Sequence, residues 1–528
     1  MMMSGPFENA AMEKTGKMIR LKTWVGSSGY LKLYLGNLIT LFLVWGGFSR
    51  CRLANSDTLW GEIDPGATLI SRLSNFRWLG YAGDWISYNV LHFYPYEHRT
   101  LSVLLFLMVL AAALLLLQLT FTGVLEVQNW TSRRKLVFLA ATSICFLNVL
   151  TSELFYFTES LLIFKASLLL AMAGCFLFSR RHYAVGTVLL FLAPMFYQMS
   201  CIYAALVLCA LAYLESEGKG FCQIFGRELG YLCAAMAGGI LNYLTGPLLD
   251  ATISRRVGYE ILPSKQIQNE SLSWLMQNVL RQLGELYESS LGLMMPLWLP
   301  FLFSLVMTVM AVCGICLAGE KEDVGIYFLY KIVSFLLMCG MAVVSFQGEF
   351  VCRVIAPFYT MQAMNALVTL YWMNRAGKRI RRWAWKPVCI SVLGYLALQC
   401  FFIQAVISNR MVSENLDILY ANQILDIVEK YEKQTGCKVK TAAFCVDSNY
   451  SVYYDQVNYC HSAVNSRVAG QGTYSLVETV ASWRGMSLGR GEMDEKVCEE
   501  YFAGKNWDTF DPEEQVVILD GNLYACVY

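Results

Sequence analysis

The chain has 528 residues, of which 56% are hydrophobic and 15% are charged, and its mean hydropathy is +0.45. This composition is too apolar for an ordinary soluble globular protein. The formal net charge is +1, and Lys and Arg occur in short clusters between apolar runs, which excludes a basic face for nucleic acid. The composition therefore predicts an α-helical polytopic membrane protein in a lipid bilayer.

Apolar runs of roughly 20 residues are long enough to cross a hydrocarbon core of about 30 Å. Between 184 and 214, one long tilted helix is an alternative to two spans, but Pro194 and the polar residues Tyr197 and Gln198 favour a break near the middle. We therefore expect about eleven spans. They lie at 31–50, 101–122, 136–156, 160–179, 184–197, 199–214, 228–247, 293–317, 326–346, 354–374 and 387–408.

The basic residues between these spans predict the topology. They fall in the N-terminal segment and in alternate loops, on one side of the membrane, at positions Lys14, Lys17, Arg20, Lys22, Arg133, Arg134, Lys135, Arg180, Arg181, Lys219, Arg227, Arg375, Lys378, Arg379, Arg381, Arg382 and Lys386. By the positive-inside rule this side is the cytoplasm, and only Arg255 and Arg256 are exceptions. The loops at 51–100, 151–159, 248–292 and 347–353 and the C-terminal tail are then expected outside the cell membrane.

This topology divides the chain into a cytoplasmic segment at 1–30, a membrane domain at 31–408 and an extracytoplasmic domain at 409–528. The first span is expected to be an uncleaved signal anchor. In the last domain, Ser413 is expected to cap a helix that runs to about Lys433. A strand at 439–446, helices at 475–483 and 493–502, and a hairpin with Asp520-Gly521 at its turn then complete a small α/β domain.

Eighteen cysteines are present, most of them inside predicted spans, where Cys acts as a small apolar residue. The outer cysteines show no metal-ligand spacing, so we expect no zinc site and at most one or two disulfides. The residues assign no cofactor, and a requirement for a divalent metal stays open.

The outer loop at 51–100 holds the first candidate site. Asp57 follows the first span, and Glu62 and Asp64 come within seven residues of it. A carboxylate here could act as a general base on an incoming hydroxyl group. A structural alternative is that Asp57 caps an interfacial helix and Arg77 pairs with Asp84. The grouping of the charges favours the functional interpretation, with Asp84 as scaffolding.

Other charged residues are expected at the same outer rim. Glu153 and Glu159 flank the hairpin between the third and fourth spans, and Lys165 lies inside the fourth. Lys165 either extends to the outer surface or neutralises a phosphate that enters from the bilayer. Arg353, at the tenth span, is a second cation of this kind, unless it only pairs with Glu349.

Four features resemble the bacterial GT-C membrane glycosyltransferases, and in particular the O-antigen glucosyltransferase family. They are an acidic residue after the first span, the segment Arg77 to Tyr81, the pair Tyr197-Gln198 with Ser200, and Arg353 beside the tenth span. The resemblance covers about 30–410 and extends loosely to the tail. Members often have two adjacent carboxylates in the first loop, whereas this chain has Ser56-Asp57-Thr58, so a second acid must come from elsewhere.

The resemblance implies transfer of a hexose, with glucose suggested, from a polyprenyl-phosphate donor to a cell-surface glycan. A single displacement at the anomeric carbon, with a carboxylate as base, would invert its configuration. Asp57 would match the catalytic carboxylate. Arg77, Lys165 and Arg353 would hold the phosphate, while acceptor or auxiliary roles would fall to Glu62, Asp64, Glu153, Glu159, Tyr197 and Gln198.

Two other classes of function remain as alternatives. A flippase or exporter of lipid-linked glycans would also need outer polar loops, but transporters tend to have internal repeats and charges at the bilayer centre. A structural or sensor protein would explain the tail but not the charges of the first loop.

Overall fold

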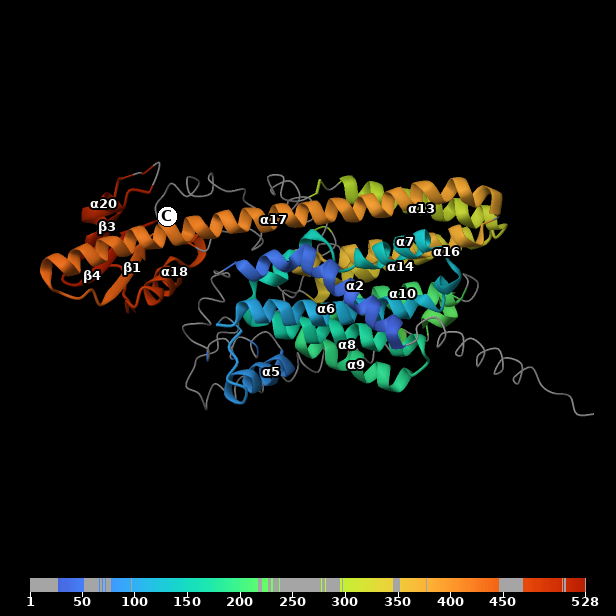
Figure 1. Cartoon of the computed structure of the whole chain (residues 1–528), viewed down its shortest axis with the longest axis horizontal. Coiled ribbons are helices and arrows are strands. Elements are labelled where there is room, and N and C mark those ends of the chain that lie inside the picture. The colour runs from blue at the N-terminus through green and yellow to red at the C-terminus, as the bar shows by residue number, and fades with distance from the viewer. Residues whose placement is uncertain are drawn as a thin grey trace, which may run out of the picture.

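A computed structural model describes residues 27–51, 77–95, 97–216, 221–226, 298–344, 352–376, 378–445, 469–505 and 510–527, with single residues or pairs between them, among them Arg72. The membrane part contains α2 (Ser27–Trp45), α5 (Trp78–Asn89), α6 (Arg99–Thr122), α7 (Ser132–Ser143), α8 (Leu161–Ser179), α9 (Tyr183–Phe196), α10 (Ser200–Glu215), α13 (Trp298–Ala318), α14 (Asp323–Val344), α15 (Cys352–Ile355), α16 (Pro357–Arg375) and the first part of α17 (Lys378–Thr435) (Figure 1). Short 3-10 helices lie at η1 (Gly46–Arg50), η2 (Val127–Asn129), η3 (Val149–Tyr156) and η4 (Thr158–Ser160).

Six of the described helices are long and apolar enough to cross a membrane, and their positions agree with predicted spans. They are Gly29–Arg50, Arg99–Thr122, Leu161–Ser179, Trp298–Ala318, Asp323–Gly340 and Trp385–Thr435. The protein is therefore a helical membrane protein. The predicted span at 228–247 and the loop at 248–292 lie almost entirely outside the described residues.

The predicted break inside 184–214 is confirmed. Helix α9 ends at Phe196, Tyr197 has an extended backbone with φ −153° and ψ 118°, and α10 starts at Ser200. The Ser200 hydroxyl donates a hydrogen bond to the Tyr197 carbonyl oxygen over 2.8 Å. This break brings a short polar segment between two apolar helices.

The predicted span at 136–156 is wrong as one continuous helix, because α7 ends at Ser143 and η3 begins at Val149. The buried Asn148 side chain provides the physical reason. Its amide group donates to the carbonyl oxygens of Ile144 and Cys145, and its oxygen accepts from the Thr151 N–H group. An amide that satisfies the backbone at both sides of a break makes that break tolerable in an apolar interior.

Helices α8 and α9 pack closely where two glycines meet. A Cβ atom at Gly174 would lie 2.7 Å from the Leu190 side chain, and one at Gly186 would lie 2.5 Å from the Phe178 ring. Small residues at helix contacts allow close backbone approach in membrane proteins. Larger residues at these two positions would therefore force α8 and α9 apart.

Helix α17 is one continuous helix of 58 residues, about 87 Å long at 1.5 Å per residue. The prediction that Ser413 caps a new helix is therefore wrong. Ser413 is fully buried inside α17, in the same stretch as the buried Arg410 and Asp417. A Ser residue caps a helix only where the backbone before it is non-helical, and no proline or glycine between 395 and 435 interrupts this one.

The C-terminal part is a small α/β unit at the far end of α17 (Figure 1). Its described strands are β1 (Thr441–Cys445), β2 (Gly489–Arg490), β3 (Val516–Leu519) and β4 (Asn522–Cys526), in the order β2-β1-β4-β3. Strand β1 is parallel to β2 and β4, and β3 pairs antiparallel with β4. The helical segments are α18 (Ala469–Trp483), α19 (Glu495–Val497), the π-helical turn η5 (Cys498–Phe502) and α20 (Pro512–Gln515).

The predicted hairpin, the strand near 439–446 and the helix near 475–483 are confirmed. Asp520 and Gly521 both have positive φ, at 50° and 76°, which is what a two-residue turn that matches the strand twist requires. The sheet packs on both faces. One face meets α17 and α18 through residues such as Leu425 and Val480, and the other meets η5 through Phe502.

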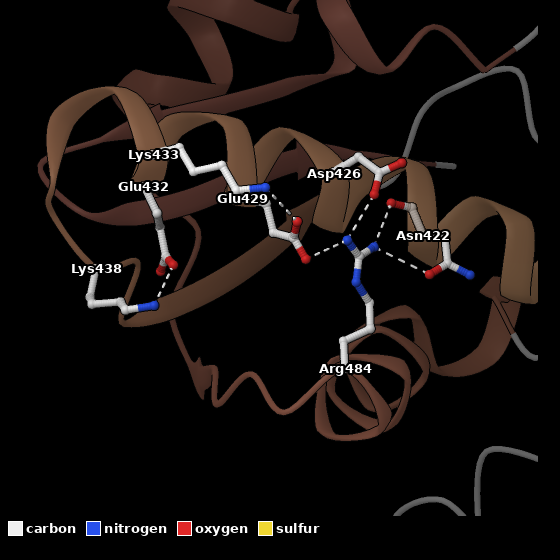
Figure 2. A network of polar contacts seen from close by, with 7 residues as sticks. All are labelled: Asn422, Asp426, Glu429, Glu432, Lys433, Lys438 and Arg484. Carbon is white, nitrogen blue, oxygen red and sulfur yellow. Dashed lines mark hydrogen bonds and ion pairs between the residues drawn. The ribbon is translucent and has the colours of Figure 1, made fainter.

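Arg484, just after α18, fastens this helix to α17 (Figure 2). Its Nη2 atom lies 2.8 Å from Asp426 and 2.6 Å from Glu429, and its Nη1 atom donates to both Asn422 oxygens. Hydrogen bonds from Arg484 are the largest cause that lowers the pKa of the Glu429 carboxyl group. One guanidinium thus joins three side chains on successive turns of α17.

We expect Arg484→Met to accelerate amide exchange in α18 about fivefold, since a charged hydrogen-bond group at a partly exposed site contributes about 1 kcal/mol. Lys433→Met is the matched control, because Lys433 pairs with the same Glu429 but is 77% exposed. The folded-state pKa of Glu429 is lowered, so its stabilisation is present above the unfolded pKa and is lost as pH falls through the folded value. Hydrogen exchange in the full-length protein, followed as a function of pH, measures the effect of Arg484→Met and the contribution of Glu429. Equal exchange rates in Arg484→Met and Lys433→Met would contradict the proposed role of Arg484.

Candidate functional site

The first buried charge pair joins Arg353 of α15 to Glu153 of η3. Arg353 Nη1 lies 2.8 Å from Glu153 Oε1, and the Arg353 backbone N–H group donates to Oε2. The Glu153 side chain is fully buried, and the Arg353 guanidinium also stacks 4.3 Å from the centroid of the Phe157 ring. Glu153 lies 200 positions away in the chain from Arg353. The partner considered from the sequence, Glu349, lies outside the described residues.

Arg77 lies at the start of α5 and contacts the predicted pair Tyr197-Gln198. Its guanidinium stacks 5.0 Å from the centroid of the Tyr197 ring, and its Nε atom lies 3.4 Å from Gln198 Oε1. Both Arg77 and Arg353 act electrostatically on the Tyr197 hydroxyl group. The structure therefore brings three of the predicted elements together at the break between α9 and α10: the α5 arginine, Tyr197 with Gln198, and Arg353.

Asp84 of α5 pairs with Arg72 rather than with Arg77, so the Arg77–Asp84 pair considered from the sequence is wrong. Arg72 Nε lies 2.8 Å from Asp84 Oδ2, and both side chains are almost fully buried. Burial raises the pKa of the Asp84 carboxyl group, while Arg72, Arg77 and Lys165 oppose this rise. Lys165 of α8 is half-buried. Because Lys165 and Arg77 both act electrostatically on Asp84, they belong to one group of cations.

Together these residues form a group that we call the rim site. The rim site consists of Arg77, Glu153, Lys165, Tyr197, Gln198 and Arg353, and its rim cations are Arg77, Lys165 and Arg353. Cations fixed by a carboxylate and an aromatic ring are suited to bind an anionic group such as a phosphate.

A second buried charge group, which the sequence analysis missed, lies on the other side of η3. It contains Arg99 at the start of α6 together with Arg410 and Glu414 of α17. Arg99 Nη2 lies 3.5 Å from the Phe155 carbonyl oxygen, and the Arg410 guanidinium stacks 5.0 Å from the Tyr156 ring. These residues flank predicted spans, where a basic residue usually reaches solvent. Their near-complete burial depends on the tertiary structure, so the sequence could not predict this group.

Cys51 belongs to this second group. Its thiol is buried, and burial is the main cause that raises its pKa, with Glu414 adding to the rise and Arg99 and Arg410 opposing it. A thiol with a raised pKa is a poor nucleophile, so Cys51 is a packing residue here. The segment η3 thus carries Glu153 toward one charge group and Phe155 and Tyr156 toward the other.

The proposed base and its neighbours lie outside the described residues. Asp57, Glu62 and Asp64 fall in the stretch 52–65, and Glu159 is described only as part of the backbone of η4. Within the part of the chain that the structure describes, no group of three or more His, Cys, Asp or Glu side chains could hold a metal ion.

The chain matches no protein-family model, and no curated protein or solved structure shows significant similarity to it.

Proposed function

We propose that this protein is a membrane glycosyltransferase that moves a hexose from a polyprenyl-phosphate donor to an extracytoplasmic glycan. The observation that carries the proposal is the convergence of Arg77 and Arg353 on Tyr197, at a break between two apolar helices. A lipid phosphate has its charge at the end of a long apolar tail. Cations held at the end of apolar helices are complementary to such a molecule.

The ion pair with Glu153 supports this role of Arg353. Glu153 fixes one edge of the guanidinium, and the Phe157 ring covers one of its faces. An electrostatic group accelerates a reaction most when it is already oriented toward the charge that develops in the transition state. The leaving polyprenyl phosphate is the group that gains charge when the glycosidic bond to the donor breaks.

The acceptor hydroxyl group is proposed to lose its proton to Asp57 as its oxygen attacks the anomeric carbon. The carbon–oxygen bond to the phosphate breaks in the same displacement, so the anomeric configuration inverts, and the phosphate leaves as the dianion facing the rim cations. This displacement changes no oxidation state and needs no redox cofactor. Asp57 is proposed as the base because it follows the first span in the sequence.

The position of α5 is compatible with this arrangement. Both α5 and the C-terminal unit lie toward the same end of the helical bundle (Figure 1). An acceptor bound near this end would approach the rim site from the aqueous phase, while the donor tail would remain among apolar helices.

The deciding experiment incubates the purified full-length protein in nanodiscs with a panel of polyprenyl-phosphate hexoses and a glycan acceptor. We expect release of polyprenyl phosphate and a glycan enlarged by one hexose with at least one donor, glucose being the first to test. A protein that moves the intact lipid-linked sugar between leaflets of proteoliposomes, with no release from any donor, would instead be a flippase.

A further inference from the structure

The C-terminal unit contains a pocket that plays no part in the rim site. Its volume is about 530 Å³, and it is lined by Ala442, Ala443, Phe444, Tyr474, Arg490, Gly491, Glu492 and Met493. Small-molecule sites in proteins commonly have volumes of about 300–1,000 Å³. The lining residues come from β1, from the last residue of β2 and the segment after it, and from α18.

The pocket lies at the carboxyl ends of two adjacent parallel strands. Strand β1 pairs with β2 only at Thr441 and Ala442, and β2 ends at Arg490. The helix that follows β1 in the described chain is α18, which packs with α17 on one face of the sheet, whereas the segment after β2 leads to η5 on the other face. Adjacent parallel strands that are followed by helices on opposite faces of the sheet open a crevice at their carboxyl ends, and ligands of open α/β sheets bind in such a crevice.

The backbone of β1 is available at this crevice. The Ala442 carbonyl oxygen accepts a hydrogen bond from the Gly491 N–H group, just after β2, over 2.8 Å. Ala442 is also the last residue of β1 that pairs with β2. In a parallel ladder alternate residues direct their polar groups to the same neighbour, so the N–H and carbonyl groups of Phe444 face the same side. Phe444 lies beyond the end of β2 and lines the pocket, and its peptide groups can therefore serve a ligand.

The side chains offer both apolar and polar surface. The ring centroids of Phe444 and Tyr474 lie 6.4 Å apart, and the Arg490 guanidinium lies 5.6 Å from the Tyr474 ring centroid. Burial raises the pKa of Tyr474 to about 12, so its hydroxyl group stays neutral at physiological pH, and it donates to the Leu488 carbonyl oxygen. Among the described residues that line the pocket, Arg490 and Glu492 are the charged ones, and their charges are opposite.

A neutral polyhydroxylated ligand matches this combination. A pyranose ring has an apolar face of C–H groups, which can pack on an aromatic ring, and a rim of hydroxyl groups that both donate and accept hydrogen bonds. A guanidinium, a carboxylate and two peptide groups supply the complementary donors and acceptors. An anionic ligand would meet the Glu492 carboxylate, and a cationic one would meet the Arg490 guanidinium.

We propose that this pocket binds a neutral saccharide unit of the acceptor glycan, away from the unit that reacts. This inference rests on the proposed function, since it names the class of acceptor that the same protein would use. The pocket would hold the glycan by a saccharide unit that takes no part in the reaction. This would raise the effective concentration of the reacting unit near the membrane.

The test measures binding by saturation-transfer NMR and calorimetry on the full-length protein in nanodiscs, without donor lipid. The probes are neutral hexose oligosaccharides, an oligogalacturonate and a neutral tripeptide. We expect binding of a neutral oligosaccharide that weakens at least tenfold in Arg490→Gln and in Glu492→Gln. The matched controls Lys496→Gln and Glu495→Gln change exposed charges nearby that do not line the pocket, and they should bind as the original protein does.

Other results would overturn the inference. Binding of the oligogalacturonate or the tripeptide in place of the neutral saccharides would reject the ligand class. Equal affinity in all four variants, or no binding by any probe, would reject the site. Because donor-dependent release of polyprenyl phosphate is a separate measurement, saccharide binding without release rejects the proposed transferase alone, and release without binding rejects the pocket alone.

Discussion

Glu153→Leu is expected to destabilise the protein by about 3 kcal/mol, because it leaves the Arg353 guanidinium without its buried carboxylate. Arg353→Met should have a similar effect, since it leaves Glu153 charged and fully buried. In the double variant both charges are absent, and at least half of the lost stability should return. Thermal unfolding of the purified protein in detergent measures the three variants.

The same variants separate a structural role of Arg353 from a functional one. If Arg353 stabilises the departing phosphate, the double variant should fold but should transfer hexose about 100-fold more slowly than the original protein. This is the loss expected when an electrostatic contact in a transition state is removed. Arg133→Met, which removes an exposed cation at the start of α7, is the control. Full transfer by a folded double variant would contradict a role of Arg353 in the reaction and leave the Arg353–Glu153 pair with a structural role at most.

Asp57→Asn is expected to lower hexose transfer by about 10²–10⁴-fold, the usual contribution of a general base, while protein yield and melting temperature stay unchanged. Asparagine is close in size to aspartate but cannot accept the proton of the acceptor hydroxyl group. The measurement is the rate of polyprenyl phosphate release in nanodiscs at saturating donor.

Glu62→Gln and Asp64→Asn are the matched controls in the same loop. A reduction of tenfold or less in these two variants would single out Asp57. Near-normal transfer by Asp57→Asn would remove Asp57 from the mechanism, and a large loss in Glu62→Gln would move the role of base to that residue.

Local patterns predicted most of the described elements. The polar residues after Pro194 correctly predicted the break between α9 and α10, and Asp520-Gly521 correctly predicted the turn between β3 and β4. Both depend on backbone preferences within a few residues, which a single sequence displays directly. Hydropathy likewise predicted the six described helices that are long and apolar enough to cross a membrane.

Predictions that depend on distant contacts were wrong or missing. The break after α7 depends on how Asn148 bonds its own backbone and on Gln399, whose oxygen accepts from the Val149 N–H group. The continuity of α17 past Ser413 depends on burial of its polar residues in tertiary contacts. Both features therefore depend in part on contacts with other segments, which the local sequence does not display.

The site shows the same division. The sequence alone predicted the class of protein and the charged residues that lie next to apolar runs. It also selected Arg77, Tyr197 and Arg353. These predictions were possible because hydropathy and charge are properties of each short segment. The tertiary structure decided the partners: Glu153 for Arg353, Arg72 for Asp84, and the second charge group around Arg99. Ion pairs form between residues far apart in the chain, and which charges become buried together depends on how the helices pack rather than on where the residues occur in the sequence.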